Sequence, residues 1–176
     1  MKLIRALILA AITVSILFQI SHAQNEIERE RISLQGIQEF GFTANIEGSR
    51  TIADSETITP AQIRRDAMER IENANLRFVD DMDVESSADI PFLYMHVNAM
   101  ELENGLIPFS IELRLYQPVK LVLHDELQTS ASTWETGMVG IVSFDRLDVI
   151  KRAASGLIDD FIEDYQRSNH RSVHAN

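Results

Sequence analysis

The residues best suited to chemistry in this sequence lie in the stretch SASTWETGMVG, which contains Trp134, the only tryptophan, and glycines at positions 137 and 140. Glycine lets a backbone approach another group closely, and an indole ring can stack on a ligand such as a sugar. The alternative is structural. In that case Trp134 packs across a sheet into a helix layer, while Gly137 and Gly140 form a bulge and a turn. We expect the structural role.

Two histidines are further candidates for a site. His96 and His124 alternate with apolar neighbours on predicted strands, where an imidazole could serve as a ligand or a base. Together with Trp134 they could line a pocket for a small ligand or for a weak hydrolase. A partly exposed strand histidine without such a role is the commoner arrangement, and we expect it here.

A polar stretch rich in carboxylates offers a candidate metal site. Asp80, Asp81, Asp83 and Glu85 are close enough in sequence to bind a hard cation, because calcium takes six to eight oxygen ligands. The stretch lacks the EF-hand pattern, since no glycine follows the third acidic position and no glutamate occupies the twelfth. A solvated acidic loop is the expectation, and weak calcium binding is the alternative.

The usual signatures of an enzyme are missing from the sequence. There is no Gly-x-Ser-x-Gly elbow, and without cysteine there is neither a thiol nucleophile nor a thiolate metal site. Paired carboxylates carry no information among 27 acidic residues. We therefore expect a protein that is not an enzyme and needs no cofactor.

The N-terminus has the pattern of a signal peptide. Lys2 and Arg5 precede an apolar stretch over residues 6–18, and small residues follow at Ser21 and Ala23. The stretch is shorter than the ~20 residues that a spanning helix needs. We expect cleavage after Ala23, no stable membrane span afterwards, and a soluble periplasmic or secreted protein. A retained N-terminal anchor is the alternative.

Length and charge limit the organisation and the partners of the exported chain. With a signal peptide at 1–23 and a disordered tail at 170–176, residues 24–169 suffice for one domain with its own core. The formal net charge of −11 opposes binding to nucleic acid or to anionic lipid headgroups, which requires clustered Lys and Arg. Stability must come from packing, because no disulfide can form.

Periodicity predicts the first half of the domain. Alternation over residues 40–46 indicates a strand with one buried face, and the polar stretch 47–56 indicates a loop. A helix should follow, with Thr59 as its N-cap, Pro60 in its first turn and Gln62 completing a capping box.

That helix should end near Asn75, before a short strand over residues 76–78. Alternation over 92–99 and 109–115, with Asn104-Gly105 between them, indicates an antiparallel hairpin. Pro118 implies a sheet edge or a bend. A long amphipathic helix should run from Asp145 to Asn169.

This order of elements predicts an α+β fold. We expect a two-layer sandwich in which two helices cover one face of a mostly antiparallel sheet of about four strands. The other face would carry a mixed, mostly polar set of residues: Tyr94, His96, Asn98, Glu112 and Arg114. That face, or an edge of the sheet, is where we expect binding.

The Ala131-Ser132-Thr133-Trp134 stretch with Gly137 and Gly140, followed by a helix ending in LIDDFIEDYQRSN, resembles a group of uncharacterised bacterial secreted or periplasmic proteins. Members of that group carry Ala-Thr-Thr-Trp-x-x-Gly-x-x-Gly and a C-terminal amphipathic helix. Here Ser132 stands in place of the first threonine. The resemblance implies export, but it implies no activity.

Together these observations favour a non-enzymatic extracytoplasmic domain that serves as a protein-interaction or assembly module in the bacterial envelope. Its partner would be another envelope protein or a second copy of itself, bound through a sheet edge or face. The alternative is a small-ligand or calcium-binding periplasmic protein, or a weak hydrolase, with a pocket near Trp134.

Overall fold

The computed structural model of the chain describes residues 28–79 and 90–170. This part of the chain is an α+β protein with one open, mostly antiparallel sheet of four strands, which confirms the predicted fold class and strand number. The predicted signal peptide at 1–23 lies outside the described residues, as does 171–176. His170, which we expected in the tail, is instead the last residue of a helix.

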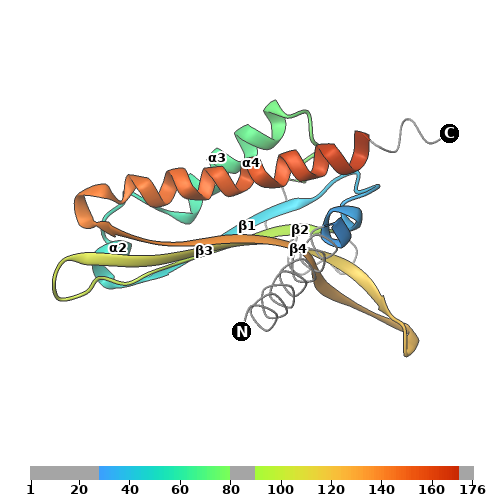
Figure 1. The fold of residues 1–176 in the computed structure, drawn as a ribbon, viewed down its shortest axis with the longest axis horizontal. Coiled ribbons are helices and arrows are strands. Elements are labelled where there is room, and N and C mark those ends of the chain that lie inside the picture. The colour runs from blue at the N-terminus through green and yellow to red at the C-terminus, as the bar shows by residue number, and fades with distance from the viewer. Residues whose placement is uncertain (1–27, 80–89, 171–176) are drawn as a thin grey trace, which may run out of the picture.

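The sheet has the order β1-β2-β3-β4, so that β1 and β4 form its two edges. The strands are β1 (Gly41–Gly48), β2 (Phe92–Ala99), β3 (Leu106–Leu121) and β4 (His124–Ser143). β1 and β2 run parallel, and the other neighbouring strands are antiparallel. A parallel pair requires a long crossover connection, and helix α3 lies within it (Figure 1).

The named helices are α2 (Arg50–Ala53), α3 (Pro60–Asn73) and α4 (Asp148–His170), and a 3-10 turn, η2 (Phe144–Arg146), joins β4 to α4. Figure 1 shows α3 and α4 on the same side of the sheet. We expected two helices, but α2 forms a third within the predicted loop 47–56. The reason is Ile52, whose side chain is fully buried and brings this stretch against the core.

The N-terminus of α3 has the predicted capping box. The Thr59 hydroxyl accepts a hydrogen bond from the Gln62 backbone at 3.2 Å, and the Gln62 side chain accepts one from the Thr59 backbone at 3.0 Å. Pro60 occupies the first turn, where no backbone donor is needed. Asn75, with a φ of 58°, has the left-handed conformation expected after the helix.

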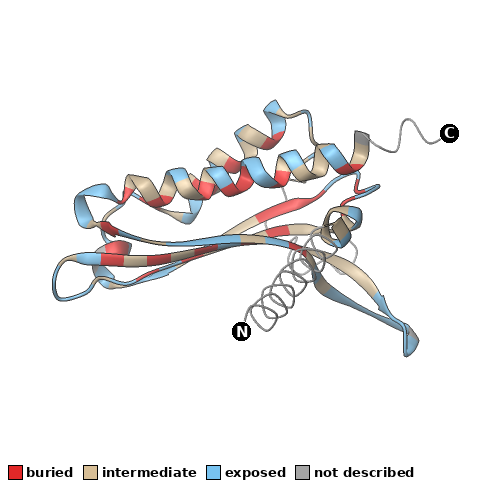
Figure 2. Ribbon diagram, in the orientation of Figure 1, coloured by how far each residue is buried: buried red, intermediate tan, exposed pale blue. Residues whose placement is uncertain are grey.

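The core lies between the sheet and the helices, and one face of each central strand contributes to it. Alternate residues of β2 and β3 are buried, as the period of two requires. On α4 the buried positions recur at helical spacing: Ile150, Ala154, Leu157, Ile158 and Phe161. Figure 2 shows these buried positions along the strands and along α4.

Two short elements differ from the prediction. Residues 28–33 form a helical turn, and the sequence did not predict a helix there. Residues 76–78 do not form a strand, and only an isolated bridge joins Phe78 to Phe40. Leu76 and Phe78 instead pack against the core as partly buried side chains, so their alternation reflects burial and not a ladder of hydrogen bonds.

The expected bulge and turn at Gly137 and Gly140 are wrong. Both glycines lie inside the continuous strand β4, opposite Glu112 and Phe109. The register shift falls instead at Thr133, because Leu115 pairs with Trp134 and Tyr116 pairs with Ser132. Glycine is needed at both positions because of contacts with the neighbouring strand β3. A Cβ atom at position 140 would lie 2.6 Å from the Phe109 ring, and one at position 137 would lie 2.8 Å from the Ile111 carbonyl oxygen.

β3 continues through Pro118, which pairs with Ser130. β2 begins at Phe92, opposite Tyr116, so among the described residues no strand lies beside β3 at Pro118, which has no N–H group to donate. Residues 117–131 thus form a two-stranded extension, here called the arm, which projects away from the rest of the sheet (Figure 1). This confirms the edge or bend that the proline predicted.

We predict that Gly137→Ala destabilises the protein by about 1–3 kcal/mol, because the backbone of β3 must move to accommodate the new methyl group. Gly156→Ala is the matched control. A Cβ atom at position 156 meets nothing within 4 Å, and alanine in a helix interior should stabilise the protein by about 0.5–1 kcal/mol. Urea unfolding measures both, and equal shifts in the two variants would contradict the steric argument.

Candidate functional site

The Trp134 indole lies in the core on the helix-covered side of β4. Only 3% of the residue is exposed, and its ring packs edge-to-face on Phe161 with the centroids 5.2 Å apart. The indole N–H donates to Asp164 Oδ2 at 3.2 Å, and Asp164 Oδ1 accepts from Arg31 Nε at 2.6 Å. The apolar ring and its single donor are therefore both satisfied within the fold.

A polar cleft of about 270 Å³ lies beside this cluster, between α4, β4 and residues 28–33. Its carboxylates include Asp160 and Glu163, and Glu163 pairs with Arg167 one helical turn further on. Burial, and then the nearby charges of Glu163 and Asp164, raise the pKa of Asp160. Among the described residues, no three His, Asp or Glu side chains come together in a way that could hold a metal ion.

The two candidate histidines lie elsewhere. His96 is on the sheet face opposite Trp134, where its Nδ1 lies 3.3 Å from the Tyr94 hydroxyl and its Nε2 lies 3.7 Å from Glu47 Oε2. His124 is the first residue of β4, at the tip of the arm, and is exposed. The structure does not bring Trp134, His96 and His124 together, so no single pocket contains all three.

The four acidic residues considered for calcium, Asp80, Asp81, Asp83 and Glu85, lie outside the described residues. They fall between Val79 and Ile90, in the connection from α3 to β2.

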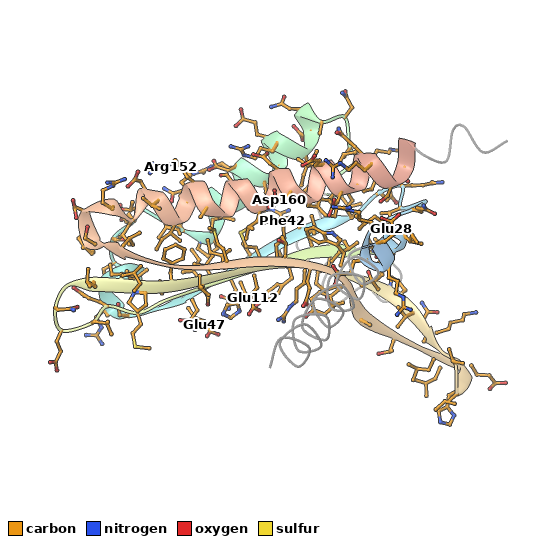
Figure 3. The ribbon with its side chains drawn as sticks, in the orientation of Figure 1. Glu28, Phe42, Glu47, Glu112, Arg152 and Asp160 are labelled. Carbon is orange, nitrogen blue, oxygen red and sulfur yellow. The ribbon has the colours of Figure 1, made fainter. Side chains whose placement is uncertain are left out.

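On the sheet face opposite α4, an arginine of β3 pairs with carboxylates of β3 and β4. Arg114 Nη2 contacts Glu112 Oε2 at 2.7 Å, and Arg114 Nε lies 3.3 Å from Glu135 Oε2. A hydrogen bond to Tyr116, and then the charges of both carboxylates, raise the pKa of Arg114. Figure 3 shows Glu47 and Glu112 projecting from this face, away from α4.

The sequence predicted binding at a face or an edge of the sheet, but it did not indicate the outer edge of β4. In the described part of the chain no strand pairs with this edge. Residues 28–33 reach it only at one end, where the Ser33 hydroxyl donates to the Thr133 carbonyl at 2.9 Å. The strand ends at Ser143 because η2 begins at Phe144. Residues 135–143 thus pair with β3 on one side and with no described strand on the other, and this outer side is here called the free edge.

The free edge is apolar at its centre. Val139 is 81% exposed and Ile141 is 65% exposed, both on the face away from α4. Beside them lies an open, mainly apolar hollow of about 620 Å³. Its lining residues are Asn98, Met100, Pro108, Phe109, Ser110, Val139, Gly140 and Ile141.

The opposite edge of the sheet differs, because its backbone is partly occupied. The Val79 N–H donates to the Phe40 carbonyl at 3.0 Å, and the Arg64 side chain donates to the Phe42 carbonyl. Exposed edges are usually guarded by lysine, proline or covering segments. Residues 137–142 of the free edge, GMVGIV, contain neither lysine nor proline.

A second exposed apolar surface lies at the tip of the arm. Val122 and Leu123 form the turn and are 96% and 89% exposed (Figure 2). The base of the arm is braced, because the Gln117 side chain donates to the Ser33 carbonyl at 3.0 Å and to the Thr133 hydroxyl at 2.6 Å. The backbones of the two arm strands pair with each other.

None of the helices in the described ranges has the combined length and apolar character that crossing a bilayer requires. No protein-family model matches the chain, and no curated protein matches it either.

We predict that Asp164→Ala lowers the free energy of unfolding by about 1–3 kcal/mol, because it leaves the Trp134 donor and the Arg31 guanidinium without this acceptor. Glu163→Ala is the control, because it removes only an exposed pair one helical turn apart, worth about 0.3–0.5 kcal/mol. Trp134 is the only tryptophan, so its fluorescence during urea denaturation reports on this cluster. Indistinguishable midpoints would show that the carboxylate does not stabilise the indole.

Proposed function

We propose that this chain is a non-enzymatic, extracytoplasmic protein-interaction or assembly module of the bacterial envelope, and that the free edge of β4 is its docking element. The proposed domain is a two-layer sandwich, in which the helix layer leaves the other sheet face and the β4 edge open. The N-terminal signal pattern and the resemblance to exported bacterial proteins support the proposed location.

One observation carries the proposal: in the described part of the chain, no strand pairs with the outer side of residues 135–143 of β4, where the apolar side chains of Val139 and Ile141 are 81% and 65% exposed. An unprotected apolar edge favours association with another strand, and natural sheets generally avoid one unless it is used. The free edge is held in place by its long ladder with β3, so it does not have to be ordered on binding.

The mode of binding we propose is strand addition. An incoming extended segment would take up the free backbone N–H and C=O groups of β4, which supplies affinity without regard to sequence. Specificity would come from the hollow beside Val139 and Ile141, where Met100 and Pro108 offer an apolar floor to side chains of the partner. The net charge of −11 further disfavours nucleic acid as the partner.

The geometry gives less support to a ligand site at Trp134. The indole has almost no exposed surface on which a sugar or a base could stack, and its N–H already donates to Asp164. The neighbouring cleft contains carboxylates that are paired with Arg31 and Arg167.

We predict that Val139→Lys abolishes docking at the free edge, because it places a hydrated charge at the centre of the apolar stretch. The full-length chain and its variants are expressed in the native organism with an affinity tag. Partners are then captured from the envelope fraction and quantified by mass spectrometry. We expect Val139→Lys to reduce recovery of the specific partner at least about tenfold, equivalent to about 1.4 kcal/mol of binding free energy.

Val122→Lys is the matched control, since it makes the same chemical change at an even more exposed valine in the arm. It should leave recovery unchanged. Both variants should keep the wild-type unfolding midpoint, because neither valine is part of the core. If the two variants recover the same partners in equal amounts, the free edge is not the docking element.

A further inference from the structure

We propose that the partner of the free edge is a second copy of this chain, paired antiparallel with the first about a two-fold axis at Val139. This inference rests on the proposed function, because it names the occupant of the same edge. The result would be one continuous sheet of eight strands across two protomers.

The limits of the free edge fix where such an axis can lie. At one end Ser33 occupies the Thr133 carbonyl, and at the other end η2 turns the chain away from Phe144 onward. An antiparallel pair that uses the whole stretch 135–143 must therefore be centred on Val139. An axis perpendicular to the sheet also keeps the helices of both copies on one side. Opposed residues then have to lie on the same face of the sheet, and faces alternate along a strand. The axis must therefore lie at a residue and not between two residues.

This register is complementary in side-chain size. Gly137 would face Ile141 of the other copy, and Gly140 would face Met138, so each glycine lies opposite a large apolar residue. Val139 would face itself on the axis. The side chains of Val139 and Ile141 from both copies would then cover each other beside the two hollows.

The register is also complementary in charge. Glu135 would face Ser143 of the other copy, so no two like charges are directly opposed. An axis shifted to Gly140 would place Glu135 opposite Asp145, and an axis shifted to Met138 would place Glu135 opposite the apolar Ile141. The Val139 register is thus the one that the charges favour among its neighbours.

The absence of cysteine permits a direct test by single-cysteine crosslinking. In the proposed dimer, the thiols that Val139→Cys introduces into the two copies would meet on the axis, where opposed Cα atoms of an antiparallel pair lie about 4.5–5.5 Å apart. A disulfide accepts Cα separations of about 4.4–6.8 Å. We therefore expect Val139→Cys to form a disulfide-linked dimer under mild oxidation.

Two matched variants test the register and the surface. Ile141→Cys lies on the same exposed face, but its copies would be about 13 Å apart along the strands, too far for a disulfide. Val122→Cys places a thiol at the exposed tip of the arm. All three variants are expressed from the full sequence and oxidised at equal concentration. The dimer fraction is measured on non-reducing gels, with circular dichroism to confirm folding.

We expect Val139→Cys to crosslink at least about tenfold faster than either other variant, and light scattering of the cysteine-free protein to show a monomer–dimer equilibrium. Because a single strand ladder is a small interface, this equilibrium should be weak. Crosslinking of Val139→Cys no faster than that of Val122→Cys, or fastest crosslinking of Ile141→Cys, would overturn the inference.

The outcome separates this inference from the proposed function. Suppose that Val139→Cys does not crosslink, but that Val139→Lys recovers less of a captured protein than the wild type and Val122→Lys do. The free edge then binds another protein, and the self-pairing is wrong. If Val139→Cys does not crosslink and Val139→Lys recovers the same proteins as the wild type in equal amounts, both the docking role of the free edge and the self-pairing are wrong.

Discussion

The central constraint on this molecule is the backbone on the outer side of β4, which pairs with no strand in the described ranges. A strand at the end of a sheet satisfies only half of its hydrogen-bonding groups within the sheet, and the other half must bond to water or to another chain. In β4 this requirement coincides with apolar side chains at Val139 and Ile141 and with a hollow next to them. The same strand that closes the core on one face therefore presents an apolar edge to solvent.

The rest of the structure holds that edge in place. Trp134, immediately before the free edge, is fixed to α4 by Phe161 and Asp164, and Asp164 is in turn paired with Arg31. Further along, the ring of Phe109 packs over Gly140 and leaves no room for a side chain there. The most unusual stretch of the sequence thus shapes the strand.

Much of the fold could be predicted from local sequence. The capping box of Thr59 and Gln62 predicted the start of α3, and the alternation in β2 and β3 predicted their buried faces, because these signals act within a few residues. The helical spacing from Ile150 to Phe161 likewise predicted α4. The turn at Val122 and Leu123 could not be predicted, since neither residue is typical of a turn.

The candidate site was less predictable, because its causes are not local. Gly137 and Gly140 looked like turn residues, but they are required by the Ile111 carbonyl and by the Phe109 ring on the neighbouring strand. A sheet edge was expected as a binding surface, but Pro118 indicated an edge at β3, and the free edge belongs to β4. Which strand lies outermost depends on the order of strands in the sheet, and alternation within one strand does not contain that information.

The most direct test of the central claim is hydrogen exchange of the backbone amides of residues 135–143 at increasing protein concentration. If the free edge pairs with a second copy, its outward-facing amides will exchange rapidly in dilute protein and become protected as the concentration rises. Amides at the tip of the arm should not change over the same range. Protection of the free edge that is already complete in the dilute monomer, or fast exchange at every concentration, would contradict it.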